Sequence, residues 1–257
     1  MPDHFLLTPY TLDQATPALE GLARPGWRLA DVPVSGDTQL DRMSSIHRRL
    51  ADLVSDSVKG GGRPVSLAGD CCAAIPVLAG LQSNGLHPVV VWLDAHGDFN
   101  TTASTVTGFL GGMPLAMMSG RGDQTLMQSV GAHLLLDDDI VLADARYLDP
   151  KESALLGGSR VHHLHSIAEV LDAIPPHRPL YIHLDFDILN PADAPAMRYS
   201  VPGGPSLADL VTLGSALHQT GRIAAVSATT WDLDADRDGR TGKACMTALG
   251  AFLGASA

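Results

Sequence analysis

Five short apolar runs recur along the chain, separated by segments with a helical pattern. The run at 87–94, HPVVVWLD, is continuous rather than alternating, which is typical of a strand in a parallel sheet that is covered on both faces. The other runs have the same character and cover residues 63–70, 139–146, 178–189 and 222–231. We therefore expect five buried strands.

Helices are predicted between these strands. The clearest covers 206–219, because Ser206 can cap its start, an apolar stripe follows, and Gly221 comes directly after its end. The remaining predicted helices cover residues 38–58, 72–83, 111–118, 151–156, 166–174 and 241–253. Strands that alternate with helices predict a single α/β domain over residues 1–257, built on a mainly parallel sheet.

The composition excludes several classes of partner. The 257 residues have a net charge of -11 and no basic cluster, which argues against nucleic-acid binding. No window approaches the roughly 18 apolar residues of a membrane-spanning helix, and the start of the chain lacks a signal-peptide pattern. Three cysteines, two of them adjacent, favour a reducing compartment. We expect a cytoplasmic protein whose partner is a small molecule, with neither nucleic acid nor membrane.

Polar residues gather where the predicted strands end. Ligands of open parallel sheets bind at the carboxyl ends of strands, so side chains placed there are candidates for a site. The clusters are Asp70 with Cys71, then Asp94 with His96 and Asp98, then Asp185 with Asp187, and finally Asp232 with Asp234. Their convergence at one edge of the sheet predicts a functional site.

The spacing of Asp94, His96 and Asp98 would place three potential ligands on one face of a strand. A single pair of aspartates more often caps a turn or forms a salt bridge, but two clusters in one sheet favour a metal. Carboxylates packed together in a crevice repel one another unless protons or cations intervene. Mixed Asp and His ligands suit Mn²⁺ or another first-row ion better than Ca²⁺. Two such ions can hold a bridging hydroxide, a strong nucleophile near neutral pH.

Four segments resemble the ureohydrolase superfamily of arginases and agmatinases. DAHGDFN (94–100) resembles its D-A-H-x-D motif and HLDFDILNP (183–191) its S-x-D-x-D-x-x-D-P motif. AGDCC (68–72) stands in the place of G-G-D-H-S, and LGGMP (110–114) in that of H-G-x-P. The resemblance spans about residues 65 to 235. It implies a three-layer α/β/α fold, one or two Mn²⁺ ions, hydrolysis of C–N bonds in guanidino compounds, and a homo-oligomer such as the trimers and hexamers that occur in the superfamily.

The resemblance also assigns residues to the metal centre. Asp94 and Asp185 would bridge two ions, His96 and Asp187 would complete one site, and Asp98 with Cys71 would complete the other, Asp98 also serving in catalysis. The family has a histidine at position 71. A thiolate prefers softer ions, so this site could bind Zn²⁺ or Fe²⁺, bind Mn²⁺ weakly, or stay empty. Cys71 could otherwise be a small buried apolar residue.

A further set of residues matches segments with which arginases bind an α-amino acid. Asn100 and Thr107 correspond to residues that hold the substrate α-carboxylate, although both could merely cap turns. Asp149 and Glu152, in DARYLDPKE (144–152), correspond to residues that recognise the α-amino group. The likeness therefore favours an amino-acid substrate over a simple amine.

Two other family residues are missing. Gly111 stands where arginases have a proton-shuttling histidine, and His183 could replace it or support a ligand instead. Thr230 stands where an acidic residue clamps the guanidinium, and Asp232 or Asp234 could supply that charge. An N-hydroxylated guanidine is less basic and easier to cleave, so it would depend less on both groups. Residues 108–114, GFLGGMP, resemble the N-omega-hydroxy-L-arginine amidinohydrolase branch of the superfamily, whereas TTWDLDADRDGR (229–240) matches it poorly.

Alternative functions stay open at this point. The same metal site could hydrolyse a formimino or amide C–N bond, or peptidyl arginine, or the chain could be a non-catalytic binding protein. DADRDG (234–239) mimics the start of a calcium-binding loop, but Cys245 stands where that loop needs a glutamate. The histidines at 162, 163 and 165 have no nearby carboxylate in sequence, and we expect surface or packing roles for them.

Overall fold

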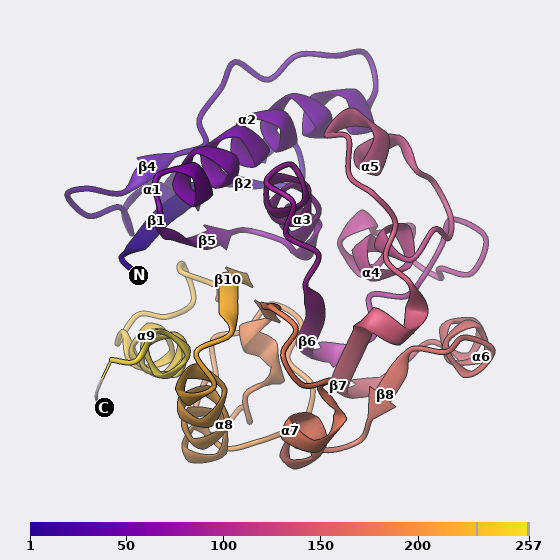
Figure 1. Ribbon diagram of the computed structural model, residues 1–257, viewed down its shortest axis with the longest axis vertical. Helices are drawn as coiled ribbons and strands as arrows, with labels where there is room; N and C mark the ends of the chain where they lie inside the picture. Colours follow the sequence, from indigo (N-terminus) through magenta and orange to yellow (C-terminus); the bar gives the residue numbers. More distant parts are fainter. Residues whose placement is uncertain (230, 256–257) are drawn as a thin grey trace.

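The computed structural model describes residues 1–229 and 231–255. Its centre is a sheet of eight strands in the order β4-β1-β5-β10-β9-β6-β7-β8, and every neighbouring pair is parallel (Figure 1). The strands are β1 (Asp3–Thr8), β4 (Arg28–Leu29), β5 (Arg63–Ala68), β6 (Val89–His96), β7 (Ile140–Tyr147), β8 (His162–Leu164), β9 (Leu180–Leu184) and β10 (Ile223–Thr229). A separate antiparallel pair joins β2 (Tyr10–Thr11) to β3 (Gln14–Ala15).

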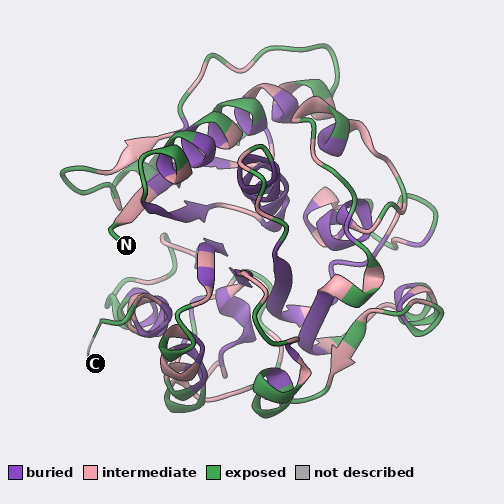
Figure 2. Cartoon of the chain, viewed as in Figure 1, coloured by how far each residue is buried: buried purple, intermediate pink, exposed green. Residues whose placement is uncertain are grey.

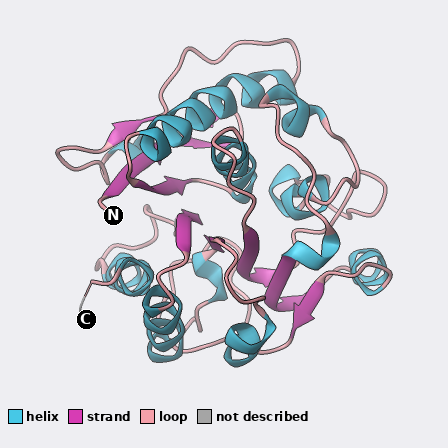
Figure 3. Cartoon of the chain, in the orientation of Figure 1, coloured by secondary structure: helices cyan, strands magenta, loops and turns pink. Residues whose placement is uncertain are grey.

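Helices cover both faces of this sheet (Figure 3). One face is covered by α2 (Gln39–Lys59), α3 (Ala74–Gln82), α4 (Pro114–Met118) and α5 (Thr125–Ser129), and the other by α7 (Val170–Ala173), α8 (Leu207–Gln219) and α9 (Arg240–Leu253). The remaining helices are α1 (Pro17–Glu20) and α6 (Pro150–Gly157), with 3₁₀ turns that include η1 (Cys71–Ala73) and η5 (Phe186–Ile188). The three-layer α/β/α prediction is confirmed. Within the described residues no helix is both long and apolar enough to cross a membrane.

Strand β6 shows how one continuous apolar run serves two cores. Its residues alternate between the faces of the sheet, as strand geometry requires. Val90 and Trp92 join the core beneath α2 and α3, whereas Val89, Val91 and Leu93 join the core beneath α8 and α9. All five are fully buried. Figure 2 shows the central strands mostly in the colour of buried residues.

All five predicted strands are present. Strands β6 and β7 have the predicted length but begin and end slightly later than expected, whereas β5, β9 and β10 are shorter than expected. The predicted strand at 178–189 ends as β9 at Leu184, because the Asp185 carboxylate accepts a hydrogen bond from the Asp187 amide (2.9 Å) and starts η5. The predicted helix at 111–118 begins only at Pro114. Strands β1, β4 and β8 were not predicted; β8 contains two of the three clustered histidines.

Burial of His47 is expected to make the stability of the fold depend on pH. This side chain is buried in α2, its Nδ1 has no hydrogen-bond partner among the described residues, and burial lowers its pKa to about 3. In the unfolded chain His47 takes up a proton with a pKa of about 6.5, whereas in the folded chain it stays neutral down to about pH 3. The free energy of unfolding therefore falls as the pH drops from about 7 toward 3. At pH 4.5 this costs about 2–3 kcal/mol. We expect His47→Leu to remove that loss.

Urea unfolding of wild type and His47→Leu is measured between pH 4 and 8 in EDTA. The other acid-sensitive groups are common to the two chains, so the difference between the chains reports on His47. The difference between their free energies of unfolding should grow steadily in favour of the variant below pH 6.5. If the free energies of unfolding of the two proteins changed in parallel with pH over the whole range, this role for His47 would be refuted.

Candidate metal centre and active site

The acidic residues of the site lie together because β6 and β9 are neighbours in the sheet. The Asp185 amide donates to the Leu93 carbonyl oxygen (2.9 Å), which places the end of β9 beside the end of β6. The Ala95 amide in turn donates to Asp187 Oδ1 (3.3 Å). Two sequence segments almost a hundred residues apart thus bring their carboxylates to one edge of the sheet, as predicted from the carboxyl ends of the strands.

Asp98 reaches this edge by a route that differs from the prediction. Strand β6 ends at His96, and Asp98 has a left-handed backbone with φ of 48°, so the three residues do not share one strand face. The Asp98 carbonyl oxygen accepts from the amides of Leu115 and Ala116 (3.0 and 3.2 Å), which ties the turn to α4. Asp98 Oδ2 is buried without a hydrogen-bond partner in the part of the chain that the structure describes.

The polar contacts divide into two groups around Asp94. In the first, His96 Nδ1 lies 3.0 Å from Asp187 Oδ2 and 3.5 Å from Asp94 Oδ1, and one ligand atom from each of these residues lies within 4.8 Å of the others. The second group places Cys71, Asp94 and His183 within the same mutual distance. The Cys71 thiol also donates to Asp185 Oδ2 (3.0 Å).

The electrostatics of this cluster require positive charge. Burial, followed by the charges of Asp94 and Asp185, raises the pKa of Asp98 well above its ordinary value. Burial and the charge of Asp185 do the same for the pKa of Asp187. Burial lowers the pKa of His96, but its hydrogen bonds to Asp187 and Asp94 outweigh this and raise it to about 12. Protons thus neutralise the cluster when no cation does, and divalent ions fit the same donors.

A pocket of about 400 Å³ opens onto this cluster. Its wall includes most of the residues that the sequence assigned to metal or substrate: Cys71, His96, Asp98, Asn100, Thr107, Asp149, Glu152, Asp185, Asp187, Asp232 and Asp234. Asp94 and His183 are absent from that wall, and both are buried. Thr230 lies outside the described residues.

The predicted substrate-binding residues stand on two loops that contact each other. Asn100 Nδ2 donates to Asp149 Oδ2 (3.3 Å), and Asn100 Oδ1 accepts from Ser104 Oγ (2.8 Å). Thr107 is exposed at the rim, where its Oγ1 accepts from the Phe109 amide (3.1 Å). Asn100 and Asp149 thus present polar groups to the pocket at a position fixed by their mutual hydrogen bond.

Glu152 has a different environment from Asp149. Its Oε1 accepts from the Phe99 amide (2.9 Å) and its Oε2 from the Asp149 amide (3.1 Å). Together with the Asp149 side chain it forms the capping box at the start of α6. Both carboxylate oxygens are thereby engaged with the backbone, and Glu152 holds the loop that follows β6 against α6.

His183 lies beneath the pocket rather than in its wall. Its ring stacks on Trp92, with centroids 3.8 Å apart, and its Nδ1 lies 2.8 Å from Ser227 Oγ. Its Nε2 is buried without a hydrogen-bond partner among the described side chains. This buried position does not support a role for His183 as a proton shuttle to a bound substrate.

The space beside Gly111 is filled by an aromatic ring. A Cβ atom at position 111 would collide with the ring of Phe109, so a larger side chain there requires that ring to move. Phe109 packs on Tyr199 with ring centroids 5.4 Å apart, and both rings line the pocket. Sequence reasoning did not select these two residues, because single aromatics in loops have no recognisable spacing.

The segment after β10 contributes Asp232 and Asp234 to the pocket. Asp232 Oδ1 accepts from the Ala235 amide (3.0 Å), whereas the side chain of Asp234 is exposed. Asp236 accepts from the amides of Thr241 and Gly242 (3.0 and 2.7 Å), so it caps the first turn of α9. The aspartates that mimic a calcium loop therefore serve a helix start and the pocket rim.

Comparison with known proteins agrees with this architecture. The Arginase family model matches residues 11–253. The arginase of Bacillus subtilis is 29% identical over 246 residues, which is 88% of this chain and 83% of that protein. The N(omega)-hydroxy-L-arginine amidinohydrolase of Streptomyces lavendulae is 33% identical over 159 residues, 60% of this chain and 56% of that protein. A crystal structure of the Bacillus subtilis arginase superposes with a TM-score of 0.85 at 24% identity, covering 100% of this chain and 99% of that one.

The fold and the family match together define a metal-binding hydrolase of guanidino C–N bonds. The chain belongs to the arginase family.

Proposed function

We propose that this enzyme hydrolyses the guanidino group of an α-amino acid and prefers N-omega-hydroxy-L-arginine to arginine. The observation that supports the preference is that position 111 is a glycine, which offers no proton donor of its own, and that the apolar Phe109 ring fills the space beside it. An N-hydroxylated guanidine is less basic than a guanidine, so its cleavage depends less on a proton donor and on a clamping charge. The likeness to the Streptomyces lavendulae enzyme over 60% of this chain points to the same substrate.

The donor set fits divalent cations, and Asp94 and Asp185 would contribute to holding two of them. His96 and Asp187 would hold one ion, and Cys71 and Asp98 would contribute to the other; Mn²⁺ suits the oxygen and nitrogen donors, and Zn²⁺ or Fe²⁺ the thiolate. When bound, such ions polarise water and make it nucleophilic near neutral pH.

The chain's own residues would orient the substrate and handle protons. Asn100 and Thr107 would hold the α-carboxylate, and Asp149 the α-amino group, at the open end of the pocket. Asp232 would face the guanidino end as the replacement charge. Asp98 Oδ2, buried and without a partner in the described structure, is the atom at which a proton from water can be held. The pocket wall of Phe109 and Tyr199 would exclude bulk water.

A substrate panel tests this proposal. The enzyme is loaded in turn with Mn²⁺, Zn²⁺ and Fe²⁺ and assayed for urea or hydroxyurea release from arginine, N-omega-hydroxy-L-arginine and agmatine. Formimino-glutamate is a further C–N substrate, assayed by formamide release. We expect kcat/KM for hydroxyarginine to exceed that for arginine by at least about tenfold, a difference of roughly 1.4 kcal/mol in transition-state binding. Agmatine should be poor because it lacks the α-carboxylate. Equal or faster turnover of arginine would defeat the proposed preference.

A further inference from the structure

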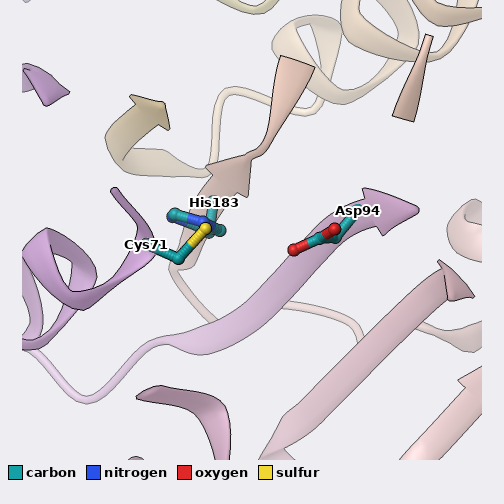
Figure 4. Close-up of side chains that lie close together, drawn as sticks. All are labelled: Cys71, Asp94 and His183. Carbon is teal, nitrogen blue, oxygen red and sulfur yellow. The ribbon is translucent and has the colours of Figure 1, made fainter. Parts of the chain in front are cut away.

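We infer that His183 is a metal ligand, and that with Cys71 and Asp94 it forms a buried thiolate–carboxylate–imidazole site at the base of the pocket. The inference rests on the proposed function only in that a metal centre is present, and it holds whichever guanidino compound is the substrate. Figure 4 shows these three side chains close together on η1, β6 and β9. One ligand atom from each lies within 4.8 Å of the other two.

The register of the sheet directs His183 toward this site. His183 pairs with Trp92 on β6 and with Ser227 on β10, so the three side chains form one row across neighbouring strands. Trp92 points into the core under α2 and α3, which is also the face on which η1 places Cys71. Asp94 stands two residues beyond Trp92 on the same strand. The imidazole therefore lies below the carboxylates, on the side of the sheet that holds the thiol.

The hydrogen-bond network sets the tautomer of the ring. The Tyr181 hydroxyl lies 3.2 Å from the Ala74 carbonyl oxygen, to which it can only donate. Tyr181 must then accept from the Ser227 hydroxyl, 2.7 Å away. Ser227 Oγ, having given its proton to Tyr181, accepts from Nδ1–H of His183 at 2.8 Å. This order leaves His183 Nε2 with a free lone pair.

That lone pair has no protein partner in the described structure, although His183 is only 1% exposed. A buried acceptor without a donor costs free energy, and a cation removes that cost. Ligating histidines commonly donate their second ring nitrogen to a protein oxygen, which fixes the ring and raises the basicity of the ligating nitrogen. Ser227 is placed to do this for His183.

The two ligand groups around Asp94 differ in softness. Cys71 and His183 offer sulfur and nitrogen, a combination that selects Zn²⁺, Fe²⁺ or Co²⁺. His96 and Asp187 offer nitrogen and oxygen, which Mn²⁺ accepts readily. We therefore expect the Cys71–His183 site to prefer the softer ion.

Cobalt titration of the metal-free enzyme tests the inference, because Co²⁺ bound to a thiolate absorbs in the near ultraviolet. Wild type should bind two equivalents, one of them with that absorption. His183→Gln should weaken this equivalent at least about 100-fold and alter its visible bands, while the other equivalent is kept. Cys71→Ser should lose the thiolate absorption. Cys72→Ser and His163→Gln are matched controls, since Cys72 contacts the Leu110 carbonyl oxygen and His163 lies on β8. Unchanged cobalt binding and spectrum in His183→Gln would overturn the inference.

Two further variants keep the test decisive if His183→Gln folds poorly. Ser227→Ala retains the imidazole but removes its acceptor, and should weaken the same equivalent about 10-fold. The double variant Cys71→His/His183→Ser moves the imidazole from β9 to η1. It should bind two Mn²⁺ equivalents, whereas His183→Ser alone should bind only one. If the double variant bound no more Mn²⁺ than His183→Ser, and Ser227→Ala kept the wild-type affinity for Co²⁺, the ligand role of His183 would also be rejected. Because the readout is metal binding, a loaded enzyme that hydrolyses no guanidino substrate would reject the proposed function alone.

Discussion

Asp94→Asn is expected to abolish hydrolysis, lowering kcat/KM by at least about 10³-fold. Asp94 belongs to both ligand groups, with Asp187 and His96 on one side and Cys71 and His183 on the other. Its Oδ2 accepts from Trp92 Nε1 (3.0 Å) and its Oδ1 from the His96 amide (2.6 Å), so the carboxylate is held in place by two donors. An amide at this position loses the charge and turns an NH₂ group toward one of those donors.

Metal content by mass spectrometry and hydroxyarginine turnover would be measured on the same preparation, with circular dichroism to check folding. Asp13→Asn is the matched control, because Asp13 is also a buried carboxylate but pairs with Arg42 (2.8 Å) away from the site. It should keep both metal equivalents. A folded Asp94→Asn protein with two metals and at least a tenth of wild-type kcat/KM would show that Asp94 is not the shared ligand.

The central strands could be predicted because each combines a continuous apolar run with burial on both faces. Strand β6 is the clearest example, since Trp92 and Leu93 enter different cores and both must be apolar. Strands β4 and β8 could not be predicted. They contain two and three residues, at the edges of the sheet, and their pairing depends on neighbours far away in sequence.

The convergence of the acidic residues was also predictable, because the carboxyl ends of parallel strands meet at one edge. The position of each side chain was not. The left-handed backbone of Asp98 departs from strand periodicity, and no local sequence pattern predicts this conformation. His183 was correctly placed on β9, but its relation to Cys71 depends on how η1 packs over the sheet. Contacts between segments far apart in the chain produce no recognisable residue spacing in a single sequence.

Glu152 illustrates the same limit, and a pair of variants separates its role from that of Asp149. Its two oxygens accept the amides of Phe99 and Asp149, so Glu152→Ala leaves two buried donors without partners and frees the turn that holds Asp98. We expect a loss of about 2–4 kcal/mol in the free energy of unfolding and a fall in kcat of about 10- to 100-fold. Asp149→Asn keeps the fold within about 1 kcal/mol, since an amide oxygen can still cap α6.

Urea unfolding and steady-state kinetics with hydroxyarginine distinguish the two residues. Asp149→Asn should raise KM, because an amide attracts the α-amino group less strongly than a carboxylate, with little change in kcat. Glu152→Gln is the conservative partner of Glu152→Ala and should recover part of the stability, because one of its two terminal atoms remains an acceptor. If Glu152→Ala instead raised only KM and unfolded like wild type, Glu152 would be a substrate contact, and the loop after β6 would be held by other bonds.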